Sequence, residues 1–151
     1  MALITAGKTN IFPATAFHAH NTSDVGLSNP TTLVPVVFNT IIQQTGSSYN
    51  TSTSQFTCPV EGWYHFTCSY EINNVAAGVW YYFGIALNGA ILHPHDAEFN
   101  SNPGGTYHKM HDDIIKYFGV GDIVTVGAAN LAGGTLLANT NQFCGILLKS
   151  G

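Results

Sequence analysis

The clearest pattern in the chain is a strict alternation of apolar and polar positions in the second half of residues 55–70. The bulky apolar side chains recur at every second position: Tyr64, Phe66, Cys68 and Tyr70. Because successive side chains of a β-strand point to opposite faces, these four groups share one face, which we expect to be core. Pro59 and Gly62 precede the strand and predict a turn. The stretch therefore predicts strand, turn, strand.

Short apolar segments between Gly, Asn and Pro residues predict further strands along the whole chain. They cover residues 14–20, 32–38, 79–87, 90–92, 106–118, 123–129 and 142–149. Residues 39–54 predict a loop with one short strand anchored by Ile41 and Ile42, and we expect loops over residues 21–30 and 131–140. No stretch has a helical period. The pattern favours an all-β sandwich of eight to ten strands.

Two of these segments carry stronger local signals. Residues 79–87 form a continuous apolar run that includes Trp80, Tyr81 and Tyr82, which predicts a strand covered on both faces. Asn88-Gly89 follows directly and predicts a tight hairpin, because both residues accept a positive φ.

Composition indicates one domain whose surface is partly covered by other subunits. Hydrophobic residues make up 45% of the 151 positions and charged residues only 8%. Surfaces of soluble domains carry roughly a quarter charged residues or more, so this deficit predicts oligomerisation. We expect a single domain over residues 14–151, preceded by an arm or edge strand over residues 1–13.

Charge and hydropathy exclude two classes of partner. The fixed cations are four lysines without any arginine, and the net charge of -4 repels polyanions, so we expect no nucleic-acid binding. No stretch approaches the roughly 20 apolar residues of a membrane helix, and the first twenty residues do not resemble a secretory signal. Three cysteines, Cys58, Cys68 and Cys144, are expected to be free thiols that act as small hydrophobic groups.

An ordered set of segments resembles the globular-head domain of complement component 1q, a branch of the tumour necrosis factor superfamily. The segments span most of the chain in the family's order: Ala16-Phe17, Val36–Asn39, Tyr49-Asn50, Phe56–Phe66, Gly121–Val124 and Phe143–Leu148. The resemblance implies a ten-stranded antiparallel jelly roll that assembles as a homotrimer through one sheet.

The resemblance also assigns faces. Seven aromatic residues are expected in the protomer core: Phe17, Phe38, Phe56, Tyr64, Phe66, Phe118 and Phe143. By alternation, His18, His20, Trp63 and His65 then face the neighbouring subunits. Phe118 replaces the leucine that the family usually has before the Gly-Asp turn.

Departures from the family shift the expected function. The chain has no collagen-like Gly-X-Y stalk and no arginine for charged targets, so immune pattern recognition is not supported. The polar surface is more similar to a phage or bacterial version of the fold. We expect a trimeric, non-catalytic module of a virion or cell surface, a fibre tip or adhesin that recognises a surface glycan or protein. The alternative is a capsid-decoration trimer that contacts viral structural proteins and has no external ligand.

Seven histidines in a chain with few other charges suggest two metal hypotheses. His18 and His20 share one strand face about 7 Å apart, and three copies at a threefold axis would offer six nitrogens to a divalent or transition metal. The second set joins His93, His95, His108 and His111 with nearby aspartates. In both cases the alternative is that the imidazoles are ordinary interface or loop groups, and no cofactor is required.

Catalysis is not expected. Nothing in the chain resembles a nucleophile elbow or a phosphate-binding glycine loop that ends in lysine. Aromatic rings near the loops, such as Tyr107 and Tyr49, either stack on sugars or seal the sandwich and subunit contacts.

Overall fold

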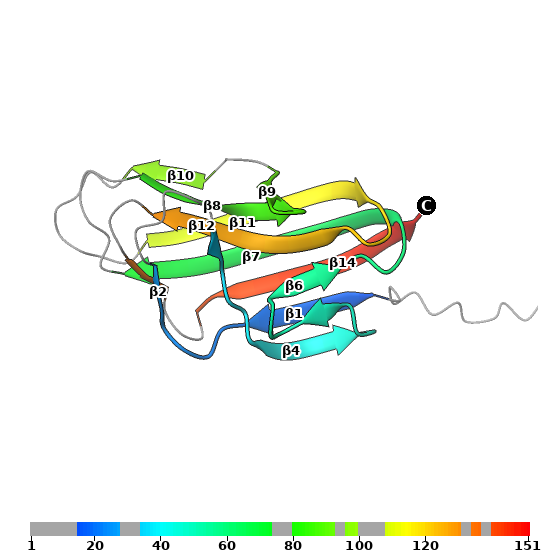
Figure 1. Cartoon of the computed structure of the whole chain (residues 1–151), viewed down its shortest axis with the longest axis horizontal. Coiled ribbons are helices and arrows are strands. Elements are labelled where there is room, and N and C mark those ends of the chain that lie inside the picture. Colours follow the sequence, from blue (N-terminus) through cyan, green and yellow to red (C-terminus); the bar gives the residue numbers. More distant parts are fainter. Residues whose placement is uncertain are drawn as a thin grey trace, which may run out of the picture.

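The computed structural model describes residues 15–27, 34–73, 80–92, 96–99, 108–130, 134–136 and 140–151. Within these ranges the chain forms fourteen strands in two antiparallel sheets, whose long strands run along the long axis of the molecule (Figure 1). The all-β prediction is therefore confirmed. The same ranges contain no helix long and apolar enough to cross a membrane.

The first sheet is built around β7, and we call it the β7 sheet. Its strands are β1 (Ala16–His20), β2 (Val25–Leu27), β4 (Thr40–Thr45), β7 (Gly62–Asn73), β11 (His108–Phe118), β13 (Gly134–Leu136) and β14 (Gln142–Ser150). β7 pairs with β11 on one side and with β14 and β13 on the other, and β1 lies between β14 and β4. Among the described strands β11 pairs only with β7, so it is a long edge strand.

The second sheet, the β8 sheet, is built around β8 and β12. Its strands are β3 (Val34–Pro35), β5 (Tyr49–Asn50), β6 (Gln55–Thr57), β8 (Trp80–Leu87), β9 (Ala90–Ile91), β10 (Asp96–Phe99) and β12 (Ile123–Asn130). The predicted hairpin joins β8 to β9, and positive φ angles of 50° at Asn88 and 85° at Gly89 match the expected turn.

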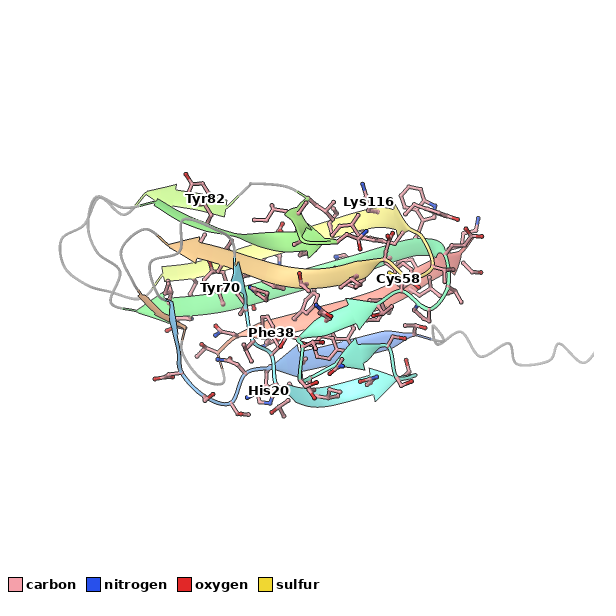
Figure 2. The ribbon with its side chains drawn as sticks, viewed as in Figure 1. His20, Phe38, Cys58, Tyr70, Tyr82 and Lys116 are labelled. Atoms are coloured by element: carbon pink, nitrogen blue, oxygen red, sulfur yellow. The ribbon has the colours of Figure 1, made fainter. Side chains whose placement is uncertain are left out.

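Aromatic rings from both sheets fill the space between them. The seven residues expected in the core are each at most 4% exposed: Phe17, Phe38, Phe56, Tyr64, Phe66, Phe118 and Phe143. Phe17 stacks on Tyr49 and Phe56, with ring centroids 4.5 and 5.0 Å apart. Figure 2 shows Phe38 and Tyr70 among the strands in the interior, whereas His20 and Tyr82 lie at opposite margins.

Gly145 of β14 lies where this aromatic cluster meets the backbone. A Cβ added there would collide with Cε1 of Phe17 and would lie 2.5 Å from Cε1 of Phe66. Protein interiors are packed as densely as organic crystals, so the two rings leave no room for a side chain. Glycine is therefore required at this position by packing.

A polar cluster ties the β8–β9 hairpin to the turn between β11 and β12. The carboxylate of Asp122 accepts hydrogen bonds from Gly119 N at 2.8 Å and from Asn88 Nδ2 at 3.0 Å. The Asn88 side chain in turn accepts one from Ile123 N at 2.9 Å. The Gly-Asp turn thus fixes the position of the hairpin next to it.

Several sequence predictions about strands were wrong in detail. Residues 39–54 hold two strands, and Ile41 and Ile42 are exposed on β4, so they do not anchor the core. Strands β2 and β13 lie inside predicted loops. Among the β8 residues whose burial the structure describes, residues 83–86 are buried, Leu87 is partly buried and Tyr82 is exposed, so the strand is not covered along its whole length. Strands of two or three residues are too short to show a period, which is why the count was too low.

Candidate functional site

The side of the β7 sheet that is turned away from the core has an unusual composition, and we call it the outer face. Alternation puts one set of side chains from four strands on it: Ala16, His18 and His20 of β1; Trp63, His65, Thr67, Ser69 and Glu71 of β7; Lys109, His111, Asp113, Ile115 and Tyr117 of β11; and Gln142, Cys144 and Ile146 of β14. The register of β14 shifts after Leu147, so that Lys149 is opposite Trp63 and Leu148 lies in the shift.

One end of the outer face is rich in exposed apolar side chains, with the charged Lys149 opposite Trp63 in the register. The exposed fractions are 48% for Trp63, 42% for Tyr117, 58% for Ile115 and 52% for Leu148. Trp63 and Tyr117 are opposite each other in the register and form an edge-to-face pair with centroids 6.0 Å apart. Large apolar groups that gather on one exposed face usually mark a contact surface.

The other end of the outer face is polar. Lys109 Nζ lies 3.3 Å from Glu71 Oε2, and His65 Nε2 lies 3.8 Å from Asp113 Oδ2. His111 Nε2 and Thr67 Oγ1 are 3.0 Å apart, within hydrogen-bonding distance. The two ends together give a sheet face with apolar and hydrogen-bonding zones, which is the usual anatomy of a protein interface.

His18 lies between these zones on β1, opposite Cys144. Its Nε2 atom is buried and has no hydrogen-bond partner. Burial raises the pKa of the Cys144 thiol, which keeps it protonated and poorly nucleophilic. His20 lies two residues further along β1 on the same side and is also partly buried.

The described part of the outer face has open hollows. One, of about 260 Å³, is lined by His65, Thr67, Cys144 and Ile146, together with the backbone beside them. A hollow of about 160 Å³ adjoins it between His18 and β4. Such surfaces suit contact with another macromolecule better than enclosure of a small substrate.

The structure places the predicted site residues as follows. His18, His20, Trp63 and His65 all lie on the outer face, as alternation predicts, but their burial by other subunits stays a prediction. His111 lies on the same face, whereas His93, His95 and the side chain of His108 fall outside the described residues. Within the described part of the chain no three His, Cys, Asp or Glu side chains are grouped to hold a metal. Both metal hypotheses remain predictions.

Sequence reasoning missed the contribution of β11 to this face. Ile115 and Tyr117 complete its apolar end, and His111 and Asp113 its polar end. The outer-face residues of β11 are the odd-numbered positions of residues 109–117. The even-numbered positions, which face the core side, include the charged Asp112 and Lys116, so the sequence of this strand shows no clean alternation of apolar and polar residues.

The three cysteines are free, as predicted, and two are fully buried. Burial, with a smaller contribution from the charge of Asp122, raises the pKa of Cys58 to about 12. A thiol with such a pKa remains protonated at neutral pH and is inert as a nucleophile.

A comparison with protein-family models matches the C1q domain over residues 16–111, close to two thirds of the chain. The chain belongs to the C1q domain family. The comparison with curated proteins gave no match. Domains of the C1q and tumour necrosis factor families form homotrimers, and their homologues are non-enzymatic proteins that are secreted, extracellular or at surfaces.

Solved structures confirm the C1q and tumour necrosis factor jelly roll. The globular domain of zebrafish complement 1qA matches with a TM-score of 0.63 and 16% identity, over 91% of this chain and 99% of that one. Eiger TNF from S. frugiperda matches with a TM-score of 0.63 and 12% identity, over 92% of this chain and 95% of that one. Murine APRIL at pH 5.0 matches with a TM-score of 0.62 and 12% identity, over 89% of this chain and 98% of that one. Likeness at this identity establishes the fold alone.

Proposed function

We propose that the protein is a homotrimeric, non-catalytic binding module of a virion or cell surface, and that the outer face forms its subunit contacts. The observation that carries this proposal is the apolar end of that face. Full burial of a large apolar side chain stabilises by about 1.5–3 kcal/mol. Four such side chains, Trp63, Ile115, Tyr117 and Leu148, are available on each protomer.

Composition supports the same assembly. Only 8% of residues are charged, which is low for a protein whose whole surface is wet. Family membership supports the threefold symmetry, because C1q domains form homotrimers. In a trimer with closed symmetry the outer face of each copy is covered by its neighbours, and no apolar sheet face is left in water.

We propose a surface glycan or protein as the ligand, as for a fibre tip or adhesin. The net charge of -4 and the absence of arginine disfavour anionic targets. Tyr82 of β8 lies on the other sheet and presents an exposed ring of the kind that stacks on sugars. It remains accessible when the outer face is covered.

A second candidate, capsid decoration, rests on a separate apolar tip. Val60 and Val120 are 40% and 70% exposed and belong to the two turns that backbone hydrogen bonds join at Cys58 and Gly121. This tip is suited to docking on a viral structural protein. A glycan array probed with the isolated protein, beside a co-sedimentation assay with viral shells, separates the two candidates.

Assembly is tested by light scattering on wild-type protein and two aliphatic surface variants. Wild type is expected at a mass near three times 16.1 kDa. Ile115→Lys puts an ammonium in the proposed contact and should give monomers, because an unpaired charge is costly to bury. Val120→Lys alters a more exposed residue outside the outer face and should remain trimeric. A wild-type monomer at micromolar concentration contradicts the proposal.

A further inference from the structure

The turn between β8 and β9 contains the only Asn-Gly pair in the sequence, Asn88-Gly89. Asparagine followed by glycine is the pair most prone to deamidation, because glycine has no side chain to keep its backbone nitrogen away from the asparagine amide. The turn is also open to solvent: both residues are exposed, and a Cβ built on Gly89 would meet no heavy atom within 4 Å. Sequence and exposure therefore favour loss of the Asn88 amide.

The hydrogen bonds of the Asn88 side chain oppose this reaction. Its Nδ2 donates to Asp122 Oδ1 at 3.0 Å, and its Oδ1 accepts from Ile123 N at 2.9 Å. The backbone N–H of Asn88 donates to Ile123 O at 2.8 Å. The two partners are thirty-four and thirty-five positions away in the sequence, so the amide is tied to a different turn of the chain. Turning it over the Gly89 nitrogen would break both side-chain hydrogen bonds.

Asp122 is the stronger of the two side-chain partners. Hydrogen bonds to a carboxylate are about twice as strong as those between neutral groups. Its second oxygen accepts from Gly119 N at 2.8 Å, which fixes the carboxylate in place. The carboxylate also opposes the chemistry itself, because the leaving nitrogen has to take up a proton and an ionised carboxylate only accepts one. Asp122 therefore acts on the Asn88 amide by position and by charge.

We propose that Asn88 is a latent deamidation site, which Asp122 keeps closed in the folded chain and which opening of the β8–β9 hairpin exposes. The inference goes beyond the proposed function and does not depend on the trimer. In the open turn the Gly89 nitrogen loses its proton to hydroxide and bonds to Cγ of Asn88. The Cγ–Nδ2 bond breaks, and Nδ2 leaves as ammonia with a proton from water. Water then hydrolyses one of the two ring C–N bonds of the succinimide, which leaves aspartate or isoaspartate. The net reaction consumes water, releases ammonia and needs no oxidant or reductant.

The product does not restore the closed turn. An aspartate at position 88 replaces the donor Nδ2 by an oxygen that carries charge next to Asp122, and two carboxylates at that distance repel each other. Isoaspartate adds a methylene to the main chain of the turn that joins Leu87 to Ala90, and the length of this turn sets the register of the hairpin. Deamidation therefore records irreversibly that the hairpin has opened.

Incubation at mildly alkaline pH tests the proposal, with intact mass spectrometry to measure deamidation and peptide mapping to separate Asn88 from the other asparagines. Wild type unfolded in guanidinium chloride gives the rate of the unprotected pair. Folded wild type should react roughly tenfold more slowly or less, because opening breaks a hydrogen bond to a charged group. Asp122→Ala should react about 10- to 100-fold faster than folded wild type. Circular dichroism checks that this variant is folded.

Ser54→Ala is the matched control for a general loss of stability. It also removes the acceptor of a backbone N–H, that of Phe38 at 2.9 Å, but it lies between β5 and β6 and leaves the contacts of Asn88 in place. Its rate at Asn88 should stay close to that of wild type. If Asp122→Ala does not fold, Asp122→Ser takes its place. The serine hydroxyl keeps an acceptor for Gly119 N–H, but its single oxygen does not serve Asn88 as well, so deamidation should again be faster.

Four results would overturn the inference. Equal rates in folded and unfolded wild type would show that the turn is not protected. A folded Asp122 variant that reacts as slowly as wild type would show that Asp122 is not responsible. Equal acceleration in Ser54→Ala would show that unfolding of the whole chain exposes Asn88. Asn88→Asp carries the aspartate product from the start and should lower the Tm by about 2–4 °C, so an unchanged Tm would contradict the consequence drawn for the product.

Discussion

Replacing Gly145 with alanine should destabilise the fold although it adds a single methyl group. The new Cβ would overlap the rings of Phe17 and Phe66. Phe17 stacks on Tyr49 and Phe66 makes an edge-to-face contact with Phe56, so neither ring can move freely. Overpacking of a filled core costs about 1–3 kcal/mol. Each kcal/mol lowers the Tm of a domain of this size by about 2–4 °C, so we expect a fall of about 2–12 °C.

Thermal and urea denaturation followed by circular dichroism measure this change, at one fixed chain concentration because an oligomer's stability depends on it. Gly26→Ala is the control, since its added Cβ meets no heavy atom within 4 Å. Its Tm should be unchanged or slightly higher. Adding Phe17→Leu to the Gly145→Ala variant should recover part of the lost Tm, since residues 17 and 145 are in contact and their effects on stability are therefore not additive. A Gly145→Ala protein as stable as wild type would refute the packing argument.

Three further predictions concern the polar turn, a buried thiol and the metal hypothesis. Asp122→Ala removes the acceptor of the Gly119 N–H and should lower the free energy of unfolding by about 1–3 kcal/mol in urea titrations; an unchanged midpoint would contradict this role. The pKa of Cys58 is raised from 9.0 to about 12, so the folded state favours the neutral thiol. The corresponding stabilisation is present below pH 9 and is lost as the pH rises toward 12. The Tm should fall over that window, and less so in Cys58→Ala. If His18 and His20 hold a metal, elemental analysis of untagged protein should give about one metal per three chains, and a metal-free trimer would end that hypothesis.

The core could be predicted from sequence because its signal is local and repeated. Tyr64 and Phe66 alternate with polar residues on a strand of twelve residues, and the structure buries both completely. Asn88-Gly89 predicted its hairpin because few residues accept its backbone angles. The prediction that Ile41 and Ile42 anchor the core was wrong, because the hydrophobicity of a residue alone does not determine whether its side chain faces the core or the solvent.

The outer face could be predicted only in part. Trp63 and His65 followed from the alternation of β7, once its core side was known. Ile115 and Tyr117 join them through pairing between strands more than forty residues apart in the chain. Such pairing depends on register, which is set by the whole sandwich and leaves no local mark in a strand as mixed as β11.

The edge position of β11 gives its charges a role beyond the fold of one chain. On the edge of β11 that does not face β7, eleven residues have no partner strand among the described strands, and their outward backbone N–H and C=O groups can pair with another strand. The chain has only twelve charged residues, and four of them stand on this strand: Lys109, Asp112, Asp113 and Lys116. A foreign strand that docked on this edge would meet charged side chains of which three already have partners: Lys109 with Glu71, Asp112 with the backbone N–H of Ile85, and Asp113 with His65. A third of the charged residues of the chain thus stands on the strand whose free edge is the longest site for pairing with a strand of another molecule among the described strands.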